Sequence, residues 1–171
     1  FSCSRQEFSK GLKLAEYWAG RVSGIQALAG ILLETDKNSL TIRSTDLNTG
    51  FEMTIAAETK KSGSAVIPAH PSIQLVSSVS GDTVRVEAAD STIHFTTQNT
   101  TSSVKGYPKD DFPTLPKIKG GENVVVSILD FLNAANSVAF AGSKSDIRPE
   151  IASIYIRGSR EGVIKMAATD S

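Results

Sequence analysis

One segment of the sequence returns about 123 residues after its first occurrence, and this repeat restricts the fold more than any single motif. Ser4-Arg5-Gln6-Glu7 is a capping box that predicts a helix over Ser4–Val22, and Ser127-Ile128-Leu129-Asp130 repeats it. The apolar positions and the closing turn repeat as well: Phe131 falls on Phe8, Ala135 on Leu12, Ile151, Ile154 and Ile156 on Leu28, Ile31 and Leu33, and, after one extra residue, Thr169-Asp170 on Thr45-Asp46. We therefore expect one complete domain followed by the first part of a second copy.

The first domain is expected to consist of two halves, each made of a strand, a helix and three strands. Alternating apolar residues separated by turn signals predict the elements of both halves. The first half holds Phe1–Ser4, the helix Ser4–Val22, Leu28–Thr35, Leu40–Arg43 and Phe51–Ala57. The second half holds Ala65–Ile67, the helix Pro68–Val79, Thr83–Ala88, Thr92–Thr97 and a weak strand within Thr100–Lys105.

This pattern predicts an α+β fold in which the helices lie on one face of antiparallel sheets. The first domain is expected to span residues 1–105, followed by a proline-rich linker over 106–121, because the residue before each proline favours extended backbone. Residues 122–171 are expected to form the incomplete second domain. We expect the chain to be a piece of a longer repeat protein, since such a fragment cannot close a core alone.

Composition is ordinary for a globular protein and gives no overall pull toward polyanions. The 171 residues are 40% hydrophobic and 21% charged, and 18 basic side chains balance 18 acidic ones. The single cysteine, Cys3, allows no disulfide within the chain and is expected to be a buried small hydrophobe, which suits a reducing cytoplasm. The sequence has no signal peptide and no apolar run of membrane-spanning length.

Charge placement in the first predicted helix is uneven. At helical spacing, Phe8, Leu12, Ala15 and Ala19 fall in one narrow stripe, and the opposite stripe contains Lys10, Lys13, Tyr17 and Arg21. A cationic stripe of this kind is either the solvated face of an ordinary amphipathic helix or a surface that binds a polyanion. The helical period alone leaves both interpretations open.

The sequence offers no convincing catalytic constellation, metal site or cofactor motif. His70 and His94 are far apart, and no Cys/His/Asp cluster has metal-ligand spacing. Ser102-Ser103-Val104-Lys105 has the Ser-x-x-Lys spacing of acyl-transfer enzymes but lacks their companion motifs. Thr45-Asp46 recurs as Thr169-Asp170, and recurrence at one place in each repeat favours a structural turn over a catalytic pair. We expect a protein that is not an enzyme.

Several motifs, in the right order and spacing, resemble those of the bacterial sliding clamp family, the beta subunit of DNA polymerase III. They are Phe1 to Phe8, Ile31 to Thr35, Ser44 to Leu47, Asp111 to Pro116, Arg148-Pro149-Glu150 and Ala168-Thr169-Asp170. The resemblance runs over the whole chain. It implies a DNA-clamp fold with three domains per subunit, of which the third is missing here, and two subunits joined head to tail as a ring around duplex DNA.

The resemblance gives the cationic stripe a role. Because helices line the hole of the ring in that family, Lys10, Lys13 and Arg21 would face the phosphates of duplex DNA, and Lys144 and Arg148 could add positive charge from the loop after the third helix. Contacts to the backbone carry no sequence information, as a sliding protein requires. The implied protein is a processivity factor without a cofactor, located in the bacterial cytoplasm at the nucleoid.

The family also implies a hydrophobic pocket, between the second and third domains, that binds short peptides. Arg148, Ile151, Thr169 and Ser171 match the wall contributed by the second domain, although Ser171 stands where the family usually has glycine. Implied partners are the catalytic subunit of DNA polymerase III, the clamp loader, and other polymerases and repair proteins. For Ile151, plain strand core is an equally good interpretation.

The sequence departs from the family at three further places. Gln26 and Ala27 stand where the family has an apolar stretch that contains a proline, and Tyr17 and Trp18 are unusual at the end of the first helix. Ser102 lies near the position where many members of the family carry a phenylalanine in the subunit interface. Two other classes of function stay open. One is a repeat-built interaction domain that binds proteins without DNA, and the other is an enzyme whose pocket gathers Asp46, His70 or His94.

Overall fold

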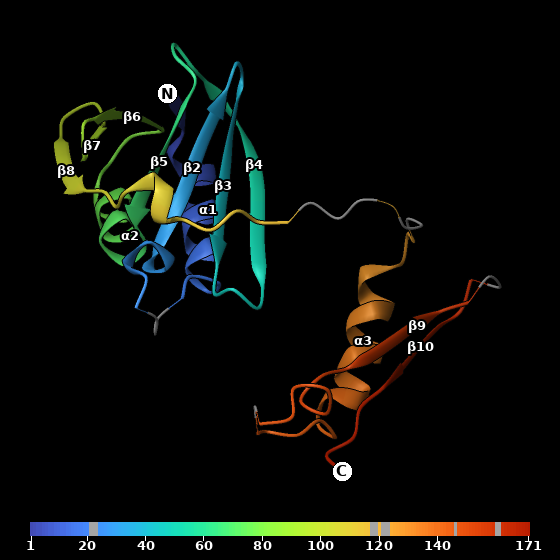
Figure 1. Cartoon of the computed structure of the whole chain (residues 1–171). Helices are drawn as coiled ribbons and strands as arrows, with labels where there is room; N and C mark the ends of the chain where they lie inside the picture. Colours follow the sequence, from blue (N-terminus) through green and yellow to red (C-terminus); the bar gives the residue numbers. More distant parts are fainter. Residues whose placement is uncertain (21–23, 117–119, 121–123, 146, 160–161) are drawn as a thin grey trace. The chain divides into compact units, whose positions relative to one another are not determined.

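The computed structural model describes residues 1–20, 24–116, 120, 124–145, 147–159 and 162–171. It divides into two compact units, Phe1–Lys117 and Ile118–Ser171, drawn in Figure 1. Each unit contains its own antiparallel sheet.

Helix α1 (Arg5–Glu16) begins where the capping box predicts. The Ser4 hydroxyl accepts a hydrogen bond from the Glu7 backbone N–H at 3.4 Å, which satisfies one first-turn donor. The prediction that the helix continues to Val22 is wrong in its described part. After Glu16 the backbone hydrogen bonds change from the i→i−4 to the i→i−3 pattern, as in the bond from Trp18 N–H to Ala15 C=O. Gly20 N–H then leaves the helix and donates to Leu28 C=O at 2.8 Å. Arg21 and Val22 lie outside the described residues.

The first unit contains one eight-stranded antiparallel sheet in the order β5-β2-β3-β4-β1-β6-β7-β8. Its strands are β1 (Ser2–Ser4), β2 (Gly30–Asp36), β3 (Ser39–Thr45), β4 (Gly50–Glu58), β5 (Gly63–Pro68), β6 (Thr83–Ala89), β7 (Thr92–Thr96) and β8 (Thr101–Lys105). Helix α2 (Ala69–Ser78) follows β5, just as α1 follows β1. Two strand–helix–three-strand halves are therefore present, as the sequence predicted.

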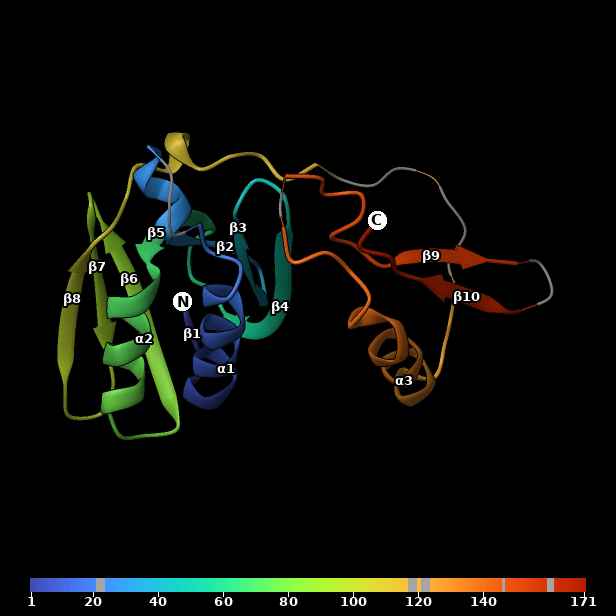
Figure 2. The same cartoon turned by 90° about the horizontal axis from the view of Figure 1, so that it is seen from below.

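The two halves are interlocked by a swapped pairing of their first strands. Strand β1 pairs with β6 of the other half through Cys3 and Val84, and β5 pairs with β2 through Ile67 and Ile31. Each first strand thus lies beside the second strand of the opposite half, which is the arrangement that a pseudo-twofold relation between the halves requires. Figure 2 shows α1 and α2 alongside one another, and the two helices are in contact.

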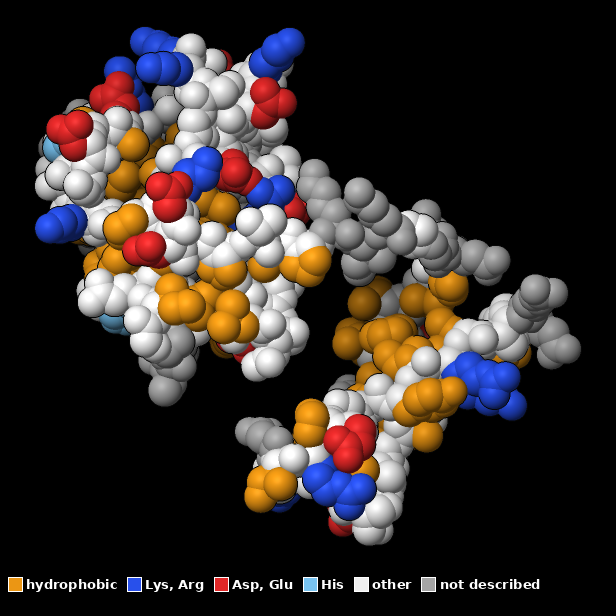
Figure 3. Space-filling model, in the orientation of Figure 1, with side chains coloured by type: hydrophobic (Ala, Val, Ile, Leu, Met, Phe, Trp, Pro, Cys, Tyr) orange, Lys and Arg blue, Asp and Glu red, His pale blue; other side chains and the backbone are white. Residues whose placement is uncertain are grey.

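Both helices bury their apolar stripes in one hydrophobic core. Phe8 and Leu12 of α1 and Val76 of α2 are completely buried together with inward-facing strand residues such as Ile31 and Ile42. The shared core places both helices on the same face of the sheet, and the predicted fold class is confirmed. The outer face carries mixed charges, seen in Figure 3 as interspersed blue and red side chains.

Strand β2 is buried on both faces because a second cluster covers its outer side. Leu32 points away from the helices and packs with Ala27, Val66, Tyr107 and Phe112. The apolar entry to β2 is a 3₁₀ helix, η1 (Gln26–Ala29), so the strand predicted from Leu28 begins at Gly30.

The segment predicted as a linker from residue 106 begins as part of the first unit. Gly106 N–H donates to Ser91 C=O at 2.7 Å, and Tyr107 N–H donates to Val66 C=O at 2.9 Å, so the chain after β8 bridges to β5. A short 3₁₀ helix, η2 (Lys109–Asp111), then leads to the buried Phe112. Phe112, which precedes Pro113, has the expected extended backbone, but the packing of Tyr107 and Phe112 holds this segment on the first unit, which is therefore longer than the predicted 1–105.

The second unit contains helix α3 (Ile128–Ala139) and the antiparallel pair β9 (Tyr155–Gly158) and β10 (Ile164–Ala167). The Ser127 hydroxyl caps α3 by accepting from Asp130 N–H at 3.4 Å, as Ser4 caps α1. Helix α3 contacts β10. Phe131 and Ala135 are only half-buried, whereas their counterparts Phe8 and Leu12 are fully buried.

The pairing register reproduces the sequence repeat residue by residue. Leu33 pairs with Ile42 in the first unit, and Ile156 pairs with Met166 in the second. Loop hydrogen bonds repeat too, since Ser143 N–H donates to Ile151 C=O at 2.9 Å just as Gly20 does to Leu28. The two units therefore share local geometry as well as the repeated sequence pattern.

Packing of Tyr107 on β2 can be tested at Gly30. A Cβ at this position would lie 2.6 Å from Val66 Cγ1 and 2.9 Å from Tyr107 Cδ2. Gly30→Ala is therefore expected to lower the free energy of unfolding by about 1–3 kcal/mol, measured by urea denaturation. The matched control is Gly63→Ala on the paired strand β5, where a Cβ meets open space. Equal effects of the two substitutions would contradict this packing.

Candidate nucleic-acid and peptide interfaces

The rotation of α1 about its axis is set by its buried side. Phe8, Leu12 and Ala15 are fully buried, and at Gly11 the helix approaches β3 so closely that a Cβ would lie 2.5 Å from Ile42 Cδ1. The opposite side therefore faces solvent. Lys10, Lys13 and Tyr17 occupy it, and we call these three residues the outward stripe.

Arg5 does not contribute to the outward stripe. Its Nε donates to Gly81 C=O at 2.6 Å, and its backbone N–H donates to Asp82 C=O at 2.8 Å, so the side chain ties the start of α1 to the turn before β6. An open hollow of about 800 Å³ lies beside this end of the helix, and Lys10 and Lys13 line it together with Asp82. Arg21, the fourth predicted member of the stripe, lies outside the described residues.

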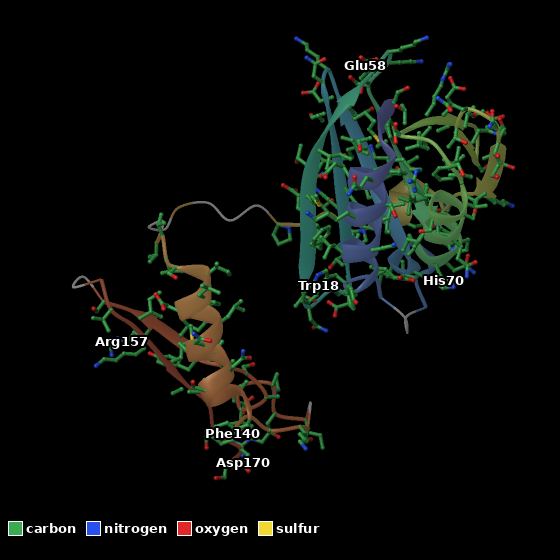
Figure 4. All side chains as sticks on the ribbon, turned by 180° about the vertical axis from the view of Figure 1, so that it is seen from behind. Trp18, Glu58, His70, Phe140, Arg157 and Asp170 are labelled. Atoms are coloured by element: carbon green, nitrogen blue, oxygen red, sulfur yellow. The ribbon has the colours of Figure 1, made fainter. Side chains whose placement is uncertain are left out.

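Helix α2 offers no cationic side chain to the solvent. Its sequence from Ala69 to Ser78 contains no lysine or arginine, and its exposed side carries His70 and Gln74. His70 Nδ1 lies 3.0 Å from Glu16 Oε1, and Gln74 Nε2 lies 2.9 Å from His70 Nε2. Figure 4 labels His70 and Trp18 at the same end of the first unit, where the end of α1 meets the start of α2. Positive charge on the helical face thus comes from α1.

The two basic residues predicted after α3 differ in their surroundings. Lys144 is exposed in the loop that follows the helix. Arg148 is exposed as well, but its Nε donates to Glu150 Oε1 at 3.2 Å, which partly compensates its charge. Sequence reasoning missed this pairing, although the two side chains stand only two residues apart.

The four residues predicted for the peptide pocket lie in two local groups. Ile151 is half-buried, and its N–H donates to Arg148 C=O at 3.1 Å, so these two residues belong to one turn. Thr169 and Ser171 are exposed, and Ser171 N–H donates to the Thr169 hydroxyl at 3.3 Å. The described hydrogen bonds act within each group.

The first unit shows how such groups meet. There, a Cβ on Gly20 would lie 3.1 Å from Leu28 Cβ and 3.6 Å from Asp46 Cα, so the end of the helical segment, η1 and the turn after β3 converge on one corner. Leu47 N–H donates to the Thr45 hydroxyl at 3.0 Å, as Ser171 does to Thr169. The corresponding residues of the second unit are Ser143, Ile151 and Asp170.

The Thr45-Asp46 pair forms a structural turn. The Asp46 carboxylate accepts hydrogen bonds from the backbone N–H groups of Asn48 and Thr49 at 3.0 and 2.7 Å, and from the Thr49 hydroxyl at 2.9 Å. These bonds, chiefly the one from Thr49 N–H, hold the pKa of Asp46 below its ordinary value of 3.8. All of this hydrogen bonding is local, as expected for a turn.

The described residues contain no cluster placed to bind a metal ion. No three His, Cys, Asp or Glu side chains among them are placed to hold a metal ion. Asp46 and His70 have separate hydrogen-bond partners, and His94 lies within β7. Burial raises the pKa of the Cys3 thiol to about 12, so this cysteine is a packing residue. No helix in the described part of the chain combines the length and apolar character needed to span a membrane.

The first unit thus interlocks two strand–helix–three-strand halves and presents Lys10 and Lys13 of α1 to solvent. The N-terminal domain of the DNA polymerase III beta subunit family matches residues 1–116. The chain therefore belongs to the DNA polymerase III beta subunit family, and the resemblance stated from its motifs is confirmed.

Individual relatives agree with this assignment. The beta sliding clamp of Synechocystis sp. is 27% identical over 98% of the chain, and that of Treponema pallidum is 22% identical over 90%. The alignments cover 45% and 42% of those two proteins, so the chain spans less than half the length of these relatives. A C. crescentus beta sliding clamp structure has the same fold, with a TM-score of 0.90 at 21% identity over 99% of this chain and 46% of that one.

Proposed function

We propose that the chain is part of a sliding clamp, a processivity factor that encircles duplex DNA and tethers the replicative polymerase to it. The observation that carries the proposal is the outward stripe of α1, where two lysines face solvent on a helix whose other side is locked into the core. The curated relatives named beta sliding clamp support it. Such a protein acts on DNA by topology and electrostatics, without catalysis or a cofactor, at the nucleoid in the bacterial cytoplasm.

In this proposal Lys10 and Lys13 contact DNA phosphates. Further phosphate contacts come from Arg21, which belongs to the same helical pattern in the sequence, and from Lys144 and Arg148 of the second unit. Each neutralised phosphate releases condensed counterions, so binding falls steeply as salt rises, and it carries no base readout. The Arg148–Glu150 pair predicts a smaller contribution from Arg148 than from Lys144. Sequence-independent attraction lets the protein move along the duplex.

The ring itself requires more chain than these two units. Two subunits of three domains each would join head to tail, and the half-buried Phe131 and Ala135 of the second unit would be covered by the remainder of that domain. Strand β8 carries Ser102 on an edge of the sheet, near the proposed subunit boundary. A serine there gives a less apolar contact than phenylalanine, which would weaken the ring.

The proposed protein-binding pocket is the second-unit counterpart of the corner that Gly20, Leu28 and Asp46 form in the first unit. Ile151 supplies an apolar floor, with Arg148 at its rim and Thr169 and Ser171 on the adjacent strand end. A leucine or phenylalanine of a partner peptide buried there would contribute roughly 1.5–3 kcal/mol. The proposed partners are the catalytic subunit of DNA polymerase III, the clamp loader, and other polymerases and repair proteins.

A protein-interaction domain without DNA binding is the second candidate function. The lack of lysine and arginine on α2 and the pairing of Arg148 with Glu150 favour it, because both reduce the number of unpaired cations available to DNA. Salt-dependent DNA retention separates the two candidates, since only the clamp requires it.

Removal of the outward cations tests the DNA interface. In the full-length protein, Lys10→Ala combined with Lys13→Ala should weaken DNA retention equally for all sequences. The slope of log affinity against log salt should decrease by up to about 0.9 for each phosphate that the variant no longer neutralises. The matched control is Lys37→Ala combined with Lys61→Ala, in exposed turns between strands. An unchanged slope in the helix variant would assign Lys10 and Lys13 to a merely solvated face.

Substitution at the second-unit corner tests the pocket. Ile151→Asp places a charge on the proposed apolar floor and should abolish binding of a polymerase-tail peptide while the ring still assembles, measured by fluorescence anisotropy and by the assembly mass. Ile147→Asp is the control, since this side chain is 90% exposed in the same loop. Peptide affinity that survives Ile151→Asp within about threefold would place the docking site elsewhere.

A further inference from the structure

The outward stripe of α1 ends in an exposed aromatic ring. Tyr17 is 79% exposed and caps the helix with helical dihedral angles, φ −60° and ψ −29°. It therefore continues the helical direction and lies two turns beyond Lys10 on the same side. The rise between the two residues is about 10 Å, which corresponds to roughly three nucleotide steps of a DNA strand.

Charge on the stripe favours an anionic partner. Gln6, Lys10, Lys13 and Tyr17 fall within one narrow sector of the helix, and that sector contains no carboxylate. Glu16 lies on the flank toward α2, where it is bound to His70. An aromatic side chain at the end of a row of lysines suits a ligand that offers both phosphates and the π-faces of bases. Such a ligand is a nucleic acid rather than an apolar peptide.

We propose that Tyr17 stacks on an unpaired base, so that the DNA surface of α1 recognises the junction between duplex and single-stranded DNA. Paired bases inside a duplex already stack on their neighbours, whereas an unpaired base presents a free π-face to an aromatic side chain. Lys10 and Lys13 hold the duplex phosphates, and Tyr17 receives the first bases of the continuing single strand. The inference rests on the proposed DNA-binding function, and it adds the kind of DNA that α1 recognises, a junction between duplex and single strand.

The neighbouring residue supplies a built-in reporter. Trp18 is the single tryptophan of the chain and is 43% exposed. At helical spacing it lies about 100° away from Tyr17, beside the stripe rather than on it. Its fluorescence should therefore change when a base is stacked on Tyr17 without Trp18 itself being required for the contact.

The test compares two DNA ligands with equal numbers of phosphates. One is a short duplex with a single-stranded thymidine tail, and the other is the same duplex with an abasic tail; a blunt duplex is the reference. The full-length protein should bind the thymidine tail about fivefold or more tightly than the abasic tail at low salt. Only the thymidine tail should quench Trp18.

Variants distinguish stacking from hydrogen bonding by the phenol. Tyr17→Ala should remove the preference for the thymidine tail over the abasic tail, whereas Tyr17→Phe should keep the preference. Equal loss in Tyr17→Phe and Tyr17→Ala, or no preference in the unmodified chain, would overturn the proposal. Lys10→Ala with Lys13→Ala should weaken both tails equally. Absence of binding to the blunt duplex at low salt, where phosphate attraction is not screened, would instead overturn the proposed function, and the junction site with it.

Discussion

Burial of one side of α1 against the sheet is the interaction on which the rest of the structure depends. Phe8 and Leu12 are fully buried, and each contributes roughly 1.5–3 kcal/mol relative to an exposed side chain. The close approach at Gly11 leaves no room to rotate the helix about its axis. Because the apolar side is held in this way, Lys10, Lys13 and Tyr17 must face solvent. The candidate DNA surface is thus a consequence of core packing.

The swapped strands extend this constraint to the whole first unit. Strand β1 leads directly into α1 while pairing with both β4 and β6, so the helix is anchored to strands from both halves. Tyr107 adds a bridge to β5, and Phe112 covers the outer side of β2. In the second unit the same local hydrogen bonds recur, from the cap at Ser127 to the bond between Ser171 and Thr169. The core residues of that unit, such as Phe131, are only half-buried. Local geometry therefore does not require the complete core.

Features encoded by short-range patterns could be predicted from the sequence. The caps at Ser4 and Ser127, the alternation of the strands and the repeat offset all depend on neighbouring residues, and each is present in the structure. The end of α1 at Glu16 could not be predicted, because helical periodicity continues past the point where Gly20 bonds to Leu28. The packing of Tyr107 and the Glu16–His70 contact depend on residues far apart in sequence. For the candidate interfaces, the outward direction of Lys10 and Lys13 followed from the period, whereas the pairing of Arg148 with Glu150 required the fold.

The ring that we propose would be linked topologically to duplex DNA, and this linkage can be measured directly. The full-length protein, assembled on a nicked circular DNA and then washed at high salt, should remain bound, because screening removes phosphate attraction but cannot open a closed ring. Cutting the same DNA once should release the protein, since it can then slide off the ends. Equal retention on circular and linear DNA, or loss from both in high salt, would contradict the account.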